Sequence, residues 1–99
     1  MEVDIPFKEQ FEESMLSGDK VCTSRNKKYG SSKDVFQRFG AHFMLVAIPK
    51  LPLKTVAFFL YKEEGFSSPE EFIDIWKKLH PRKGYDPEQL VFVHFFIRV

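Results

Sequence analysis

Two short and nearly apolar segments most limit the fold of this chain. Residues 41–48 (AHFMLVAI) and residues 90–97 (LVFVHFFI) contain few polar side chains. Both are well short of the roughly 20 apolar residues that a membrane-spanning helix needs. Their length and their aromatic and β-branched content are instead typical of buried strands. Because residues 41–48 are apolar on both faces, we expect this strand to lie in the centre of a sheet.

Three helices are predicted from residue spacing and from capping residues. The first spans residues 8–17, where apolar side chains recur every four residues, and Gly18 follows it as a C-cap glycine. The second spans residues 53–63, which keep helical spacing of their apolar side chains. The third begins at the capping sequence Ser68-Pro69-Glu70-Glu71 and is stopped by Pro81.

Two more strands and their turns complete the pattern. Residues 21–25 and 34–39 are predicted to form short strands, separated by a polar loop at residues 26–32. Residues 49–52 include two prolines and are expected to form a turn. The order of one helix, three strands, two helices and a final strand predicts a small α+β fold with a mostly antiparallel sheet that curls toward a barrel. A chain of 99 residues is expected to form one domain, residues 1–99.

The composition excludes several classes of site. The single cysteine, Cys22, excludes an internal disulfide and a cysteine-based zinc site. His42, His80 and His94 show no metal-ligand spacing, so we expect structural histidines and neither a metal nor a cofactor. The N-terminal segment has no apolar core of a signal peptide, which favours a cytoplasmic protein.

One eight-residue motif carries a resemblance to a known family. Residues 18–25 (Gly-Asp-Lys-Val-Cys-Thr-Ser-Arg) resemble the signature Gly-x-Lys-x-x-[Thr/Glu]-x-Arg of the ASCH family, whose members are PUA-like β-barrels that hold RNA or modified nucleosides. The resemblance extends over nearly the whole chain, through Glu63-Glu64-Gly65-Phe66, Trp76 and the ending that starts at His80-Pro81. It implies a small PUA-like β-barrel of mostly antiparallel strands with about three helices.

The resemblance also implies candidate catalytic residues. One branch of small ASCH proteins comprises amidohydrolases that act on N4-acetylcytidine with a Lys, a Thr and a Glu. These match Lys20, Thr23 and Glu64, with Glu63 as an alternative to Glu64. Lys20, its pKa lowered by burial, would deprotonate Thr23, and Glu64 would protonate the leaving amine. Val21 departs from this branch, which favours a second Thr beside the lysine.

Each candidate also has a purely structural explanation. Lys20 and Glu64 would be exposed charges in turns, and Thr23 would serve the strand by its β-branched shape. Arg25, on the same strand face as Thr23, has planar donors that suit a phosphate or the carbonyl edge of a base. An ion pair between Arg25 and an acid of the second or third helix is an equal alternative.

The loop after the motif offers contacts for a nucleic acid. Residues 17–38 hold six basic and two acidic residues, although the net charge of the chain is only +1. Lys27 and Lys28 would contact a phosphate backbone by charge, or else form part of a solvated loop. Tyr29 and Phe66 lie in or beside loops, where a base can stack on an aromatic ring.

Two functions are therefore expected, and the first is favoured. The first is a module that binds RNA or a modified nucleoside and holds a base in the mouth of the barrel. The alternative is a small amidohydrolase that deacetylates N4-acetylcytidine with Lys20, Thr23 and Glu64. In both, the partner is RNA or a nucleoside, and we expect a monomer that uses neither a membrane nor a metal.

Overall fold

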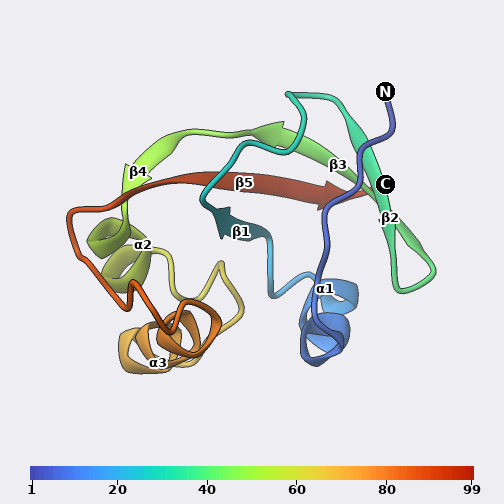
Figure 1. Ribbon diagram of the computed structural model, residues 1–99. Coiled ribbons are helices and arrows are strands. Elements are labelled where there is room, and N and C mark those ends of the chain that lie inside the picture. Colours follow the sequence, from blue (N-terminus) through green and yellow to red (C-terminus); the bar gives the residue numbers. More distant parts are fainter.

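A single curled sheet organises the molecule, as the computed structural model of residues 1–99 shows (Figure 1). The hydrogen-bonded strand order is β1-β5-β3-β2, and β4 also pairs with β5. All of these pairs are antiparallel. The strands are β1 (Cys22–Arg25), β2 (Val35–Arg38), β3 (Ala41–Ala47), β4 (Lys50–Pro52) and β5 (Leu90–Arg98). The expected α+β fold with a curled, antiparallel sheet is therefore confirmed.

The C-terminal strand β5 is the axis of the sheet. It pairs with β1 along one side and with β3 and then β4 along the other. The register of β3 against β5 shifts between Leu45 and Ala47, so Val46 is an extra residue in the ladder. Such a bulge bends and twists a strand, which helps the sheet to curl. The two ends of the chain lie near the same end of the sheet (Figure 1).

Two sequence-based expectations about this part of the fold need correction. The predicted turn at residues 49–52 contains the short strand β4. The prolines leave Lys50 and Leu51 free to pair with β5. The carbonyl oxygen of Pro49 also accepts a hydrogen bond from Val93 N–H at 2.8 Å. Strand β3 lies between β5 and β2 as expected, but it is not buried on both faces. Its residues alternate, and Val46 is 46% exposed.

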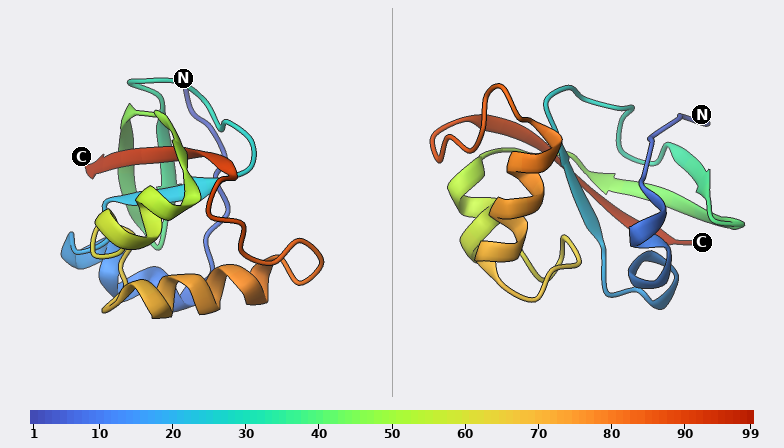
Figure 2. Two further views of the ribbon diagram at one scale, coloured as in Figure 1. Left: turned by 90° about the vertical axis from the view of Figure 1, so that its left-hand side faces the viewer. Right: turned by 60° about the horizontal axis from the view of Figure 1, so that its bottom comes forward.

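The capping residues predict the end of the first helix and the start of the third correctly. The N-terminal helical segment has a 3₁₀ turn (Glu9–Phe11) followed by α1 (Glu12–Ser17), and Gly18 closes α1 with a φ of +88°. Helix α3 (Pro69–Leu79) starts at Ser68, whose side chain accepts a hydrogen bond from Glu71 N–H at 3.2 Å. Helices α2 (Leu53–Phe59) and α3 pack side by side, whereas α1 lies apart from them (Figure 2).

Helix α2 is shorter than the predicted helix at residues 53–63. The chain leaves the helix at Leu60 and forms turns up to Gly65. The peptide N–H groups of Val21 and Cys22 both donate to Glu63 O, at 2.7 and 3.1 Å. This long-range pairing holds the segment after α2 against the start of β1, so Glu64 lies in a turn and not at a helix end.

The hydrophobic core has two parts, which use opposite faces of β5. Val91 and Val93 pack with Cys22 against α2 and α3, whereas Phe96 packs with the aromatic cluster of Phe7, Phe36 and Phe43. Alternation along a strand separates these two sets. Strand β1 lies at the edge of the sheet, next to β5.

Candidate functional site

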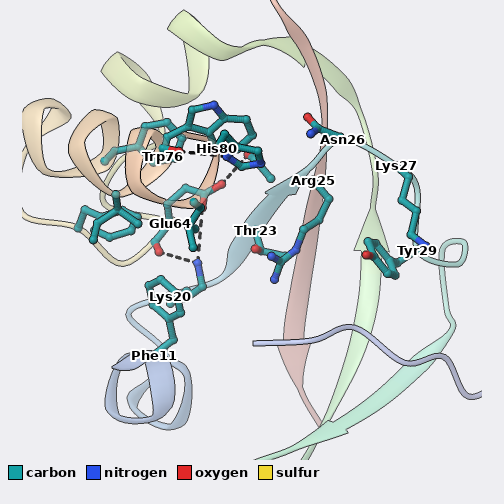
Figure 3. A pocket seen from close by; sticks show the side chains of 15 residues that line it. Phe11, Lys20, Thr23, Arg25, Asn26, Lys27, Tyr29, Glu64, Trp76 and His80 are labelled. Carbon is teal, nitrogen blue, oxygen red and sulfur yellow. Dashed lines mark hydrogen bonds and ion pairs between the residues drawn. The ribbon is translucent and has the colours of Figure 1, made fainter. Parts of the chain in front are cut away.

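A cavity of about 440 Å³ opens along the edge strand β1 (Figure 3). One side is formed by β1 and the loop that follows it, and the other by α3. Phe11 and the turn that carries Glu64 also line it. The exposed side chains of Asn26, Lys27 and Leu79 belong to the lining, so the cavity opens to solvent.

Lys20 is buried in this cavity and fully engaged by acceptors. Its Nζ donates to Glu64 O at 2.7 Å and to Cys22 O at 2.9 Å, and it lies 3.5 Å from Glu64 Oε1. The same ammonium lies 4.4 Å from the centroid of the Phe11 ring. Burial lowers the pKa of Lys20, and the Glu64 carboxylate opposes that shift. The alternative of an exposed surface lysine is wrong, since Lys20 is only 2% exposed.

Glu64 is also buried and is held from two sides. Its Oε1 faces Lys20 Nζ, and its Oε2 accepts a hydrogen bond of 2.6 Å from Ser24 Oγ. Gly65 allows this approach, because its φ is +97° and an added Cβ would lie 3.1 Å from Lys20 Cβ. Glu64, not Glu63, therefore faces the cavity, which answers the choice that the sequence left open.

Ser24 is a cavity residue that the sequence analysis did not single out. Strand alternation places it on the face opposite Thr23, yet both line the cavity. The reason is the edge position of β1, which exposes side chains of both faces to one space. No local signal in the sequence indicates which strand lies at an edge.

Thr23 lines the cavity without the partner that a nucleophile needs. It pairs with His94 across the strands and is 5% exposed. No hydrogen bond joins its hydroxyl to Lys20, whose nearest acceptors are the carbonyl oxygens of Cys22 and Glu64. Cys22 itself is buried, burial raises the pKa of its thiol, and its side chain packs in the core.

Arg25 lines the cavity and is held at its far end by backbone. One terminal nitrogen donates to Pro6 O at 2.6 Å, and the guanidinium lies 5.1 Å from the centroid of the Phe7 ring. Its buried Nε has no hydrogen-bond partner. Burial lowers the pKa of Arg25. The alternative of an ion pair with an acid of the second or third helix is wrong, because no carboxylate contacts it within 4 Å.

The other predicted binding residues lie at different depths. Lys27 and Tyr29 line the cavity near its mouth, with Lys27 Nζ 4.8 Å from the centroid of the Tyr29 ring. Lys28 is exposed and lies outside the cavity lining. Phe66 lines the cavity but packs edge-on against Phe11 and Phe72. The structure therefore brings all the predicted site residues except Lys28 to one cavity.

Helix α3 and its C-cap residue contribute two rings that were not among the predicted site residues. Trp76 and His80 both line the cavity, and their rings stack with centroids 4.0 Å apart. The spacing of Phe72, Trp76 and His80 at every fourth residue was the signal available in the sequence, because it places the three rings on one face of a helix.

No group of three His, Cys, Asp or Glu side chains is placed to hold a metal ion, and no helix is long and apolar enough to cross a membrane.

His94 supports the loop that carries Tyr29. Its Nε2 accepts a hydrogen bond of 2.9 Å from Tyr29 N–H, so the neutral ring carries its proton on Nδ1, which lies 3.0 Å from Phe92 O and 3.3 Å from Thr23 O. Burial lowers the pKa of His94, the two carbonyl oxygens oppose this shift, and Arg25 and Lys28 add to it.

We expect the free energy of unfolding to fall as the pH decreases from 7 to 5. A histidine with a lowered folded-state pKa stabilises the fold above its unfolded value near 6.5, and this contribution is lost as the pH falls toward the folded-state value. One proton changes the stability by at most about 1.4 kcal/mol per pH unit. Urea unfolding at several pH values measures this slope.

A matched pair of variants assigns that slope to His94. His94→Gln keeps an acceptor for Tyr29 N–H but does not titrate, so it should flatten the pH dependence. His42→Gln changes an exposed histidine and should keep it. An unchanged slope in His94→Gln would show that another group is responsible.

The comparisons with known proteins concern the fold. A scan against models of protein families finds no match, and a search of curated proteins finds none. Solved structures do match. The ASCH domain from Lactobacillus crispatus JV V101 is similar with a TM-score of 0.76 and 9% sequence identity, over 98% of this chain and 78% of that chain.

Two further crystal structures share this architecture. The hypothetical protein PH0355 has a TM-score of 0.77 and 14% identity over 100% of both chains. Protein EF3133 from Enterococcus faecalis V583, of the DUF984 family, has a TM-score of 0.65 and 18% identity, over 91% of this chain and 70% of that chain. Together with the curled sheet and the cavity at its edge, these likenesses show that the chain has the fold of an ASCH domain.

Proposed function

We propose that this chain binds RNA or a modified nucleoside and holds one base in the cavity beside β1. The observation that carries the proposal is the lining of that cavity. Polar groups of Thr23, Ser24, Arg25 and Glu64 meet aromatic rings of α3 within about 440 Å³. A largely apolar cavity with a few converging polar groups is the usual form of a small-ligand site.

The charges at the mouth favour a ligand that carries phosphate. Lys27 lies on the rim and Lys28 lies just outside it, and both are exposed. Exposed lysines interact with phosphates in a sequence-independent and salt-dependent way. In this proposal the base enters the cavity and the backbone of the RNA passes the loop of residues 26–32. The module acts as one monomeric domain of residues 1–99 in a reducing compartment such as the cytoplasm, in keeping with its single buried cysteine.

We expect wild-type protein to bind a short single-stranded RNA with an affinity that falls as salt increases. Thr23→Val keeps the β-branched shape and removes the hydroxyl, so it should weaken binding of cytidine, N4-acetylcytidine and RNA about 5-fold, the effect of one hydrogen bond near 1 kcal/mol. Lys28→Ala should weaken the binding of RNA but not of the nucleosides. It should also reduce the slope of the logarithm of RNA affinity against the logarithm of salt concentration by about one. Fluorescence anisotropy and calorimetry measure both effects.

The control for Thr23 is another threonine. Thr55→Val makes the same change on α2, away from the cavity lining, and should leave all affinities unchanged. A wild-type protein that binds neither the nucleosides nor the RNA at low salt would refute the proposed function.

A second candidate function is hydrolysis of an N4-acyl group. It is favoured by one observation, that Lys20, Thr23 and Glu64 line the same cavity. Lys20 can accept the proton of Thr23 only as a neutral amine, whereas its contact with the Glu64 carboxylate favours the ammonium, and no hydrogen bond joins Lys20 to the Thr23 hydroxyl. The engaged state of Lys20 therefore favours binding over hydrolysis. Release of cytidine from N4-acetylcytidine by wild type and not by Thr23→Val would reverse this preference.

A further inference from the structure

Three aromatic side chains form a column along α3. Phe72, Trp76 and His80 follow one another at every fourth residue, on one face of the helix. The Phe72 and Trp76 rings are 6.1 Å apart at an angle of 26°, and the Trp76 and His80 rings are 4.0 Å apart at an angle of 22°. Phe72 and Trp76 are buried, whereas His80 is half-buried. All three rings line the cavity, and the column is most exposed at His80.

The last ring of the column is held in place. His80 is the C-cap residue of α3, and both its backbone N–H (2.9 Å) and its Nδ1 (3.0 Å) pair with Trp76 O. The Trp76 ring covers one face of the imidazole. His80 itself lines the cavity, and Trp76 leaves the opposite face of the imidazole uncovered. Figure 3 shows Trp76 and His80 on the α3 side, with Arg25 and Tyr29 on the β1 side.

We propose that His80 is a stacking platform on which a planar heteroaromatic ring of the ligand continues the Phe72–Trp76–His80 column. This inference rests on the proposed function and adds the wall of the cavity that would contact the base. Stacking on a fixed ring accepts any flat base, because every base has a π face. Selection among bases then falls to the polar groups across the cavity, at Thr23, Arg25 and Glu64.

The platform is useful only because its position is fixed in advance. An aromatic ring that is already immobilised loses little conformational freedom when a ligand stacks on it. In contrast, Phe66 and Tyr29 already have partners for their rings, namely Phe11 and Phe72 for Phe66, and Lys27 for Tyr29. Among the cavity rings, His80 combines a fixed orientation with a face that its neighbour leaves uncovered.

The test compares two replacements of similar size. His80→Phe keeps a flat ring and removes the nitrogens, whereas His80→Leu removes the flat ring. We expect His80→Phe to bind cytidine and a short single-stranded RNA within about 3-fold of wild type, and His80→Leu to bind about 10- to 100-fold more weakly. Ribose 5-phosphate, which has no aromatic ring, should show no difference among the three proteins. Urea unfolding confirms that each variant is folded.

A spectroscopic readout separates stacking from a merely structural role. Trp76 is the only tryptophan, so its fluorescence reports on the column. Cytidine should also shift the ring-proton resonances of His80 upfield. If His80→Leu weakens the binding of cytidine, a free nucleoside is an occupant of the cavity. If His80→Leu weakens the binding of RNA alone, the occupant is a base within a strand.

The possible failures are distinguishable. If wild type binds cytidine or RNA and all His80 variants bind equally well, the platform is wrong while the proposed function stands. Equal loss in His80→Phe and His80→Leu would also reject stacking, because it would assign the contact to a ring nitrogen. If wild type binds none of the probes, the proposed function fails and the platform fails with it.

Discussion

Replacement of Lys20 by methionine should lower the free energy of unfolding by about 3–5 kcal/mol, the usual cost of leaving one member of a buried ion pair alone. Methionine keeps the length of the side chain but removes the ammonium. The Glu64 carboxylate, only 3% exposed, would keep Ser24 as its partner and lose its cation. The carbonyl oxygens of Cys22 and Glu64 would lose their donor as well. Urea unfolding measures the change.

A second ion pair provides the control. Lys54 and Glu88 are closer together, at 2.7 Å, but their side chains are 50% and 69% exposed. Lys54→Met should therefore cost less than about 1 kcal/mol. The double variant Lys20→Met with Glu64→Gln removes the stranded charge and should recover part of the loss. Equal costs for the two lysines would contradict the structural role given to Lys20.

Replacement of Phe36 by alanine should cost about 3–5 kcal/mol, as large-to-small changes of a buried phenylalanine do. Phe36 is 1% exposed and lies at the centre of the aromatic cluster. Its ring stacks on Phe7 and Phe43, at 5.6 and 5.2 Å, and meets the Phe96 ring edge-on at 5.4 Å. Denaturant midpoints from urea unfolding measure the effect.

The same substitution at an exposed position is the control for the cluster. Phe59, at the end of α2, is 79% exposed, and Phe59→Ala should change the stability by no more than about 0.5 kcal/mol. If Phe36→Ala does not fold at all, Phe36→Leu provides a milder measurement, expected to cost less than about 1.5 kcal/mol. A similar loss from Phe36→Ala and Phe59→Ala would place Phe36 outside the core.

The parts of the fold that were predictable depend on local signals. Ser68 caps α3, Gly18 closes α1, and residues 90–97 form most of β5. Each of these features follows from capping chemistry or from the length of an apolar run. The end of α2 was not predictable, because it depends on hydrogen bonds from Val21 and Cys22 to the distant Glu63 carbonyl.

The candidate site also has parts that the sequence predicts and parts that it does not. The motif around Lys20 and the match to Glu64 were enough to predict that these two residues meet, although they are 44 positions apart. Ser24 was missed because alternation alone assigns it to the other face of its strand. His80 was taken as structural because its spacing from Trp76 does not show that this face of α3 lines the cavity. Both omissions concern tertiary placement and not residue type.

The edge position of β1 has a consequence for the behaviour of the molecule in concentrated solution. A sheet edge is a place where a second chain can add its own strand, and proteins commonly cover such edges. Here the turn at Glu63 covers only the start of β1, through hydrogen bonds to Val21 and Cys22. The rest of that edge borders the cavity. A ligand bound as proposed would therefore shield the same edge against self-association, and occupancy of the site would increase the resistance to aggregation.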